Sequence, residues 1–232
     1  MSEERFVVAT IRPWNVAAFH RVFGRDERMH LLTERPMLTV ERLQALRPRY
    51  VFFPHWSWII PEEIWRPFEC VVFHMTDVPY GRGGSPLQNL IARGHEQTLI
   101  SALRVESGLD AGPVYLKRPL ALHGSAAEIY ARAADIIFGD MIPCLIAAQP
   151  IPTPQTGEVV AFQRRTPAQS AVPPGLSPRQ LYDHIRMLDA PGYPHAFIEE
   201  GGYRHEFRSA SLAEDGQSVT ASVTIMPAGA CA

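Results

Sequence analysis

Short apolar and β-branched runs alternate with helical patterns from Arg5 to Gln149. Five runs have the length and composition of strands, and they cover residues 5–11, 50–53, 70–73, 98–105 and 113–117. Such alternation is typical of βαβ units around a parallel sheet. The first three runs are almost wholly apolar, which indicates strands that are covered on both faces. The pattern therefore predicts an α/β domain with a mostly parallel sheet.

Two segments of this region carry helix signals. Residues 39–46 have helical composition and stop before Pro48, because proline disfavours a helical residue in front of it. Ser125 and Glu128 can form a capping box, and apolar residues then recur at every fourth position. These residues are Ile129, Ala133, Ile137, Met141 and Leu145. We expect one long helix with a buried stripe at the end of this region.

A proline-rich stretch divides the chain. Prolines recur throughout residues 150–176, which predicts a stiff, extended connection. Three signals follow it, a capped helix start, a glycine hairpin and an alternating strand, at residues 177–180, 201–202 and 217–225. We expect a first domain at residues 1–149 and a small α+β module at residues 177–232.

Composition and charge exclude several classes of protein. The chain is 46% hydrophobic and 20% charged, which is globular composition rather than that of a disordered chain. Its 22 basic and 24 acidic residues form no polybasic run, so we expect neither a nucleic-acid nor a membrane surface. Acidic residues stand where a signal peptide would be basic, which favours a cytoplasmic protein. The cysteines at 70, 144 and 231 fit no disulfide or metal spacing.

His74 ends an apolar strand, and a loop rich in glycine follows it. Functional groups gather at the carboxyl ends of strands in open α/β sheets, so His74 is placed like a catalytic residue. Asp110 lies in a second turn, where an aspartate is often only a turn-former. If the two loops are neighbours, Asp110 can bond to the imidazole and fix its tautomer for acid–base work.

Two motifs resemble a known family. The first is HxxxxPxxRGxxPxQ, with His74, Pro79, Arg82, Gly83, Pro86 and Gln88, and the second is GLDAGP at residues 108–113. Together they resemble the 10-formyltetrahydrofolate-dependent formyltransferases, which include methionyl-tRNA and sugar-nucleotide enzymes. The resemblance covers the first domain from about Val51 onward. It implies a Rossmann-like formyltransferase domain in which His74 and Asp110 are catalytic.

One position departs from the family pattern. The family has an asparagine two residues before the histidine, and here that residue is Val72. The family asparagine is thought to hold the formyl oxygen, and here protonated His74, backbone N–H groups or a polar neighbour would have to do so. The polar candidates are His55, Thr76 and Asn89. The alternative is a chain that has lost the activity and only binds folate or a nucleotide.

A resemblance also predicts which substrate accepts the formyl group. Residues 52–57, 73–91, 112–120 and 185–197 look like enzymes of the pseudaminic-acid type, which act on a UDP-linked amino sugar. The first expectation is therefore an N-formyltransferase for a nucleotide sugar. Formylation of methionyl-tRNA or an ornithine-type amine is the alternative, and the tail at residues 177–232 lacks the basic surface that tRNA favours.

The resemblance also implies two sets of contacts, besides direct attack of the amine on the formyl group. Residues expected to contact the folate donor are His55, Trp56, Leu103, Arg104, Val105, Glu106, Gly108 and Asp110. Residues expected to contact the acceptor are Arg12, Trp14, Thr76, Tyr80, Gly81, Arg82 and Gly83. Trp56 fits core packing as well as a pterin contact. No metal site is expected, and the C-terminal module serves acceptor binding or a homodimer contact.

Overall fold

The computed structural model describes residues 4–229, so Cys231 lies outside the described residues. The chain forms two compact units, each made of several segments. The first unit contains residues 1–83, 98–120 and 130–161, and the second contains residues 84–97, 121–129 and 162–232. The domain boundaries predicted from the sequence assign each domain one continuous stretch, and those boundaries stay a prediction.

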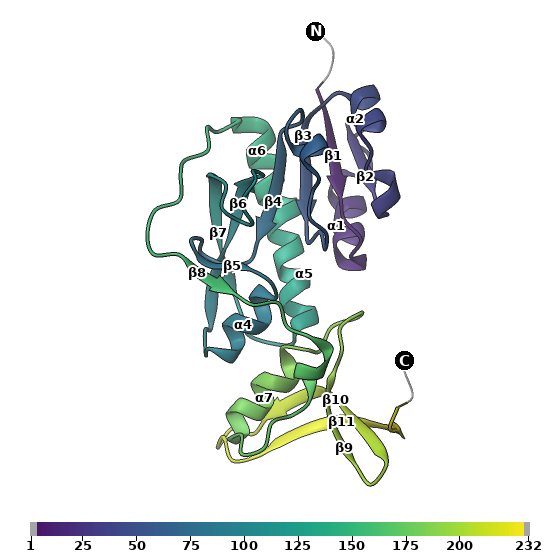
Figure 1. Ribbon diagram of the computed structural model, residues 1–232, viewed down its shortest axis with the longest axis vertical. Coiled ribbons are helices and arrows are strands. Elements are labelled where there is room, and N and C mark those ends of the chain that lie inside the picture. Colours follow the sequence, from purple (N-terminus) through teal and green to yellow (C-terminus); the bar gives the residue numbers. More distant parts are fainter. Residues whose placement is uncertain (1–3, 230–232) are drawn as a thin grey trace. The chain divides into compact units, whose positions relative to one another are not determined.

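The first unit is built on a six-stranded sheet (Figure 1). Its strand order is β2-β1-β3-β4-β6-β7, and the strands are Met29–Leu32, Arg5–Ala9, Pro48–Pro54, Cys70–His74, Gln97–Arg104 and Val114–Ala121. The pairs β1–β2, β1–β3 and β3–β4 are parallel, whereas β4–β6 is antiparallel. The predicted α/β class with a mostly parallel sheet is confirmed, and all five predicted runs form strands.

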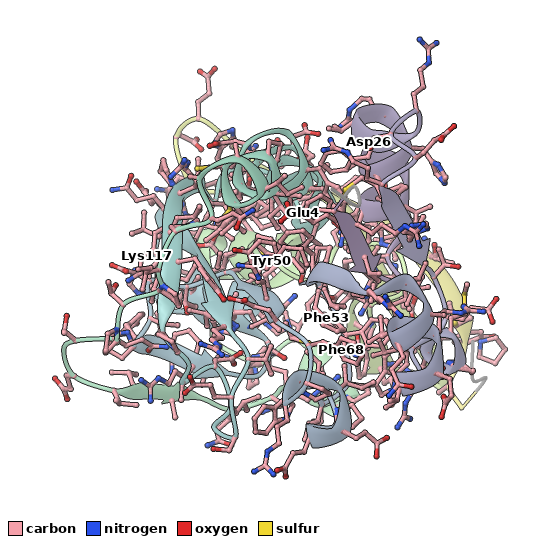
Figure 2. All side chains as sticks on the ribbon, turned by 90° about the horizontal axis from the view of Figure 1, so that it is seen from above. Glu4, Asp26, Tyr50, Phe53, Phe68 and Lys117 are labelled. Carbon is pink, nitrogen blue, oxygen red and sulfur yellow. The ribbon has the colours of Figure 1, made fainter. Side chains whose placement is uncertain are left out.

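Both faces of this sheet are covered, as the apolar runs indicate. Successive strand residues point to opposite faces. Phe53 packs in a cluster with Leu43 of helix α2 (Val40–Leu46) and Ile64 of helix α3 (Glu62–Trp65). Tyr50, three positions earlier, lies on the opposite face from Phe53, and Figure 2 shows Phe68 on the Phe53 side. Full burial of one such side chain contributes about 1.5–3 kcal/mol, so β3 anchors both layers.

The predicted long helix is present but changes its winding. It runs as α5 (Ala126–Ile136), a π-helical turn (Ile137–Met141) and α6 (Ile142–Ala148). The five stripe residues are all buried, and Ser125 and Glu128 form the capping box. An α-helix has about 3.6 residues per turn, so a four-residue repeat drifts around it, and the wider π turn offsets that drift. Pro143 favours the π turn, because it lacks the N–H for the regular helical bond.

The second unit pairs helices with an antiparallel sheet. Helix α7 (Pro178–Arg186) begins with a Ser177–Gln180 capping box, as predicted. It packs against the sheet β11-β10-β9, formed by Val219–Pro227, Tyr203–Leu212 and Ala196–Glu200. The turn between β9 and β10 is the predicted glycine hairpin. Gln88 of helix α4 (Pro86–Ala92) donates to the Met187 carbonyl over 3.1 Å, which ties α4 to the end of α7.

The expected proline-rich connection contains more structure than predicted. It includes strand β8 (Val160–Phe162), which pairs with β5 (Tyr80–Gly83), and a short 3-10 helix, η3 (Pro167–Ser170). Helix α1 (Pro13–Phe23), the short 3-10 helix η1 (Arg35–Met37) and strand β2 also carry no prediction from the sequence. Within residues 4–229, no helix is long and apolar enough to cross a membrane.

Candidate active site

His74 and Asp110 meet at the carboxyl end of β4. His74 is the last residue of that strand, and Asp110 lies in the turn between β6 and β7. His74 Nδ1 is 3.5 Å from Asp110 Oδ2, and their side chains are only 9% and 14% exposed. This separation suits an ion pair and is long for a hydrogen bond. The structure therefore places the two predicted catalytic side chains within reach of each other.

The imidazole of His74 faces an acceptor on each nitrogen. Its Nε2 lies 2.8 Å from the Gly81 carbonyl, and its Nδ1 faces the Asp110 carboxylate. A neutral imidazole donates from one nitrogen, whereas the imidazolium donates from both. A nitrogen of His74 that bears hydrogen thus points at an acceptor oxygen in this structure. A nitrogen that bears hydrogen is also the group required of a donor to a developing oxyanion.

Asp110 is held by its side chain and by an unusual backbone. Its φ of 50° lies in the left-handed region, which aspartate tolerates better than most residues. Gly83 N donates to Oδ2 over 3.0 Å, so this oxygen faces both the glycine loop and His74. Among residues 4–229, no group donates to Oδ1. Oδ1 is therefore the carboxylate oxygen left to accept a proton.

Gln155 also contacts this site, although no sequence pattern predicts a role for it. Its Nε2 donates over 2.8 Å to the carbonyl of Asp110 and over 2.8 Å to that of Gly112. Its Oε1 accepts from Arg82 Nε at 3.0 Å and Nη2 at 2.8 Å. The guanidinium of Arg82, which was expected to contact substrate, is thus directed at Gln155. A glutamine among prolines 45 residues away from Asp110 has no local signal for such a role.

Arg12, Trp14 and His55 gather at the carboxyl ends of β1 and β3. Trp14 stacks on Tyr130 with 5.1 Å between ring centroids, and His55 packs 4.7 Å from the same tyrosine. The Arg12 guanidinium lies over the Trp14 ring. Burial, and then the charge of Arg12, lowers the pKa of His55 to about 3. His55 is therefore neutral at pH 7 and cannot supply a positive charge to an oxyanion.

The expected folate contacts divide into two groups. Leu103 is fully buried in β6, and the N–H groups of Arg104 and Val105 donate to the carbonyls of Pro113 and Cys70. These groups serve the sheet in this structure. Glu106 and Gly108 are exposed in the turn that carries Asp110. Trp56 packs edge-on against Phe53 and Trp58, which matches the core-packing interpretation of that residue.

The polar candidates for the asparagine duty are already engaged. Val72 packs against the core cluster around Phe53. Thr76 is buried and donates to the Gly81 carbonyl over 3.2 Å, beside the bond from His74. The amide of Asn89 donates to three backbone carbonyls. His74 Nε2 bonds to the same Gly81 carbonyl, so each of these side chains must exchange a present hydrogen bond before it can donate to a formyl oxygen.

Other predicted residues have simpler roles. Tyr80 N donates to the Asp77 carbonyl in the turn before β5. Burial raises the pKa of the Cys70 thiol to about 12, so this cysteine stays protonated. No group of three or more His, Cys, Asp or Glu side chains able to hold a metal occurs in residues 4–229.

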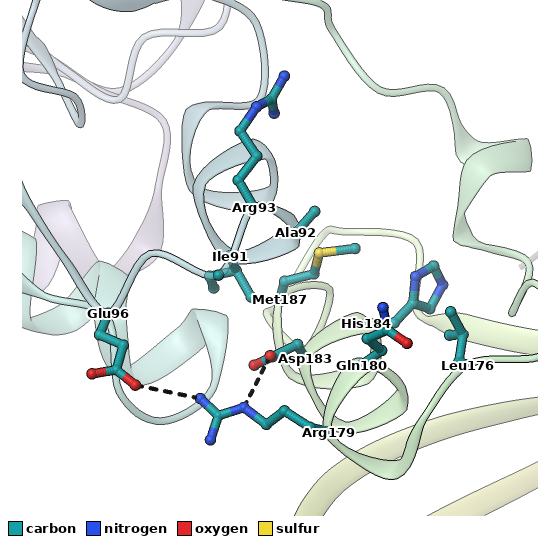
Figure 3. A pocket seen from close by; sticks show the side chains of 11 residues that line it. Ile91, Ala92, Arg93, Glu96, Leu176, Arg179, Gln180, Asp183, His184 and Met187 are labelled. Carbon is teal, nitrogen blue, oxygen red and sulfur yellow. Dashed lines mark hydrogen bonds and ion pairs between the residues drawn. The ribbon is translucent and has the colours of Figure 1, made fainter.

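The second unit contains a separate cavity of about 540 Å³ between α4 and α7 (Figure 3). Among its charged residues, Arg179 contacts Asp183 at 3.1 Å and Glu96 at 3.9 Å, whereas Arg93 donates to the neutral side chain of Asn89. Burial lowers the pKa of His184, which bonds to the Ser170 carbonyl. The cavity contains neither His74 nor Asp110, and it is separate from the candidate active site.

Comparison with known proteins decides the family. A family model described as the C-terminal domain of methionyl-tRNA formyltransferase matches residues 167–226. The structure of methionyl-tRNA formyltransferase from Clostridium thermocellum is 47% identical, with a TM-score of 0.92, and the alignment covers 97% of this chain and 100% of that one. The chain belongs to the formyltransferase family. This membership was implied by the two motifs and is confirmed.

Relatives of this formyltransferase-family chain differ in length. Methionyl-tRNA formyltransferase of Xylella fastidiosa (strain M23) is 31% identical over 134 residues, which are 54% of this chain and 44% of that protein. The match thus spans less than half the length of the curated relative.

Two more distant structures share the fold alone. HypX from Aquifex aeolicus, solved in complex with tetrahydrofolic acid, is 18% identical with a TM-score of 0.74, over 92% of this chain and 39% of that one. A sugar N-formyltransferase from Shewanella sp FDAARGOS_354 is 14% identical with a TM-score of 0.67, over 91% and 99% of the chains. Identity therefore favours the methionyl-tRNA enzymes over the sugar-nucleotide enzymes that the sequence stretches suggested.

Proposed function

We propose that this chain transfers a formyl group from 10-formyltetrahydrofolate to an amine. The observation that carries the proposal is the His74–Asp110 pair, 3.5 Å apart at a strand end, in a member of the formyltransferase family. The complex of the more distant HypX with tetrahydrofolic acid supports a folate donor. The donor, when bound, supplies the formyl group on N10.

The residues of the site divide the work of the transfer. An N–H group of His74 donates a hydrogen bond to the formyl oxygen, where negative charge develops as the amine adds. Asp110 orients the imidazole through Oδ2 and takes the amine proton through Oδ1. The bond from the amine nitrogen to the formyl carbon forms, the bond from that carbon to N10 then breaks, and N10 leaves with the proton that Asp110 took from the amine. Direct attack by the amine needs no covalent bond to the protein.

Methionyl-tRNA is the acceptor that the comparisons support best. The 47% identical relative carries that activity in its name, and its alignment includes the whole of that chain. The family model over residues 167–226 is also described as a methionyl-tRNA formyltransferase domain. The acceptor amine would then be the α-amino group of the esterified methionine.

An amino sugar linked to a nucleotide is the second candidate, and charge favours it. The segment at residues 177–232 has four arginines against seven acidic residues. A long polyanion such as tRNA is bound best by a basic surface, whereas a nucleotide diphosphate needs only one or two cationic groups. Either acceptor presents a primary amine to the same site.

The deciding experiment is a formyl-transfer assay with 10-formyltetrahydrofolate and each acceptor in turn. We expect transfer to methionyl-tRNA, and a loss of about a hundredfold or more in kcat for His74→Ala and for Asp110→Ala. Circular dichroism and thermal unfolding show whether each variant keeps its fold. Transfer only to the amino sugar would replace the acceptor and keep the chemistry.

Other results would contradict the proposed formyl transfer or the role of one of its residues. If the wild-type protein formylates neither acceptor but still binds tetrahydrofolate, the chain is a silent binding homologue. A near-normal rate for one of the two variants would remove that residue from the mechanism.

A further inference from the structure

The side chain of Gln155 joins two parts of the active site that the sequence keeps apart. It accepts two hydrogen bonds from Arg82 and donates to the carbonyls of Asp110 and Gly112. All four bonds are 2.8–3.0 Å long. The glutamine thus links the glycine loop after His74 to the turn that carries Asp110.

The chemistry of these neighbours permits only one orientation of the amide. A guanidinium can only donate, so the group facing Arg82 must be the oxygen. The two carbonyls can only accept, so the group facing Asp110 and Gly112 must be the NH₂. The reverse orientation would oppose donors to donors and acceptors to acceptors. Gln155 is therefore matched to both sides, and a carboxylate of the same size would match only the Arg82 side.

The turn that carries Asp110 has few other attachments. Residues 106–109 are exposed, and Leu109 is 67% exposed, so apolar packing does not hold the turn. Asp110 has a left-handed backbone conformation, which persists only where contacts fix it. The segment that carries Gln155 is itself fixed, because Thr153 and Val114 exchange two backbone hydrogen bonds of 2.9 and 2.7 Å. Gln155 is thus anchored by its own segment and bonds to the backbone of an exposed turn.

We propose that Gln155 is a positioning residue for formyl transfer, which holds the backbone of Asp110 so that its carboxylate faces His74. This inference rests on the proposed function above. Arg82 then acts through Gln155, as the cation that fixes the orientation of the amide. In this role Arg82 supports the backbone of Asp110, and its contact with the acceptor stays a prediction.

Two substitutions at position 155 separate this role from a simple contact with Arg82. Gln155→Glu keeps the acceptor for Arg82 but turns an oxygen toward the two carbonyls, and Gln155→Ala removes both sides. We expect each to lower kcat about 10- to 100-fold, with KM for the acceptor changed less than threefold, because a displaced catalytic group slows chemistry more than binding. Gln163→Ala is the matched control, since this exposed glutamine lies in the same part of the chain. Full activity of Gln155→Glu would overturn the proposal.

A double-mutant cycle measures whether the effects of Gln155 and Asp110 on kcat are coupled, which a merely structural role of Gln155 would not produce. If Gln155 acts through Asp110, then Gln155→Ala in an Asp110→Ala background lowers kcat by less than about twofold more. If the loss of kcat in the double variant equals the product of the two single losses, Gln155 does not act through Asp110, and the proposal fails. Unfolding midpoints of all variants show that the fold is kept.

Hydrogen–deuterium exchange tests whether Gln155 holds the turn at residues 106–113, which we call the clamp, and it needs no measurement of enzyme activity. We expect the peptide that covers residues 106–113 to exchange faster in Gln155→Ala and Gln155→Glu than in the wild type and in Gln163→Ala. Unchanged exchange would overturn the clamp whatever the rates are. Faster exchange in a protein that formylates no acceptor would keep the clamp and reject the proposed function, so the two failures are distinguishable.

Discussion

His55 shows how packing sets the charge of a single residue in this protein. It lies at the end of β3 against Trp14 and Tyr130, and its φ is 52°. Burial lowers the pKa of its imidazole to about 3, so the ring enters the folded protein without a proton. In the unfolded chain the same ring titrates near its ordinary value of 6.5. Folding and protonation of His55 are therefore linked.

The sign of this linkage gives a pH-dependent stability. Between pH 6.5 and about 3 the unfolded chain binds one proton more at His55 than the folded chain does. The free energy of unfolding should fall with pH across this window, by at most about 1.4 kcal/mol per unit from this residue. We expect the wild type to lose about 1–2 kcal/mol more than His55→Asn between pH 7.5 and pH 5 in urea unfolding. Asparagine suits the left-handed backbone here.

The comparison of the two pH values removes effects that both proteins share. The smaller asparagine destabilises the protein at both pH values, and His184 and His195, whose pKa values burial also lowers, titrate in both proteins. An equal loss of stability in the two proteins would show that His55 accepts a proton in the folded state.

At the scale of residues, the sequence predicted that His74 and Asp110 lie close together, but it did not predict the contact of Gln155 with the Asp110 turn. His74 and Asp110 lie at strand ends within motifs, and the order of the sheet brings their loops together. Gln155 is polar, solitary and surrounded by prolines, and only the folded chain shows which carbonyls it reaches. Arg82 was assigned to the acceptor because it stands inside a motif, whereas its direction depends on Gln155.

At the scale of elements, the junction between β6 and β7 depends on one glycine. A side chain at Gly112 would place its Cβ 1.8 Å from the Arg104 carbonyl oxygen. The same two strands pair there through Arg104 N and the Pro113 carbonyl. A larger residue would therefore have to separate the strands at the point where the Asp110 turn begins.

Gly112→Ala should consequently lower both stability and activity. We expect the free energy of unfolding to fall by about 2–3 kcal/mol in urea titration, a typical cost of a steric clash with backbone. Gly139→Ala is the control, because a Cβ at that helical position meets nothing within 4 Å. It should be neutral or more stable by up to about 1 kcal/mol. Equal behaviour of the two variants would contradict the close approach at Gly112.

The elements that were missed lack the features that pattern analysis uses. Strand β2 has only four residues, one of them His30, and β8 has three within a proline-rich stretch. The π turn was not predicted, because a four-residue apolar repeat of this length is also compatible with an ordinary α-helix. Capped helices were found because Ser125 and Ser177 bond within their own first turn, which is a local interaction.

At the scale of the whole molecule, charge bears on the choice of acceptor. The chain has a formal net charge of −2, and acidic residues outnumber basic ones in residues 177–232. A protein that binds tRNA through many phosphate contacts releases as many counterions, which makes its affinity fall steeply with salt. With only four basic residues, the segment at residues 177–232 can make few such contacts.

We therefore expect recognition of methionyl-tRNA, if it is the acceptor, to concentrate on the aminoacylated end. The apparent affinity measured as 1/KM should fall with a log–log salt slope of about 2 or less, since each phosphate contact contributes roughly 0.7–0.9 to the slope. Initial rates between 50 and 300 mM KCl measure it, with a nucleotide-linked amino sugar as the short-acceptor control. A slope above about 4 would contradict this expectation, because it would require a basic surface for tRNA that residues 177–232 do not supply. Binding of the tRNA phosphates would then depend on basic residues elsewhere among the 22 in the chain.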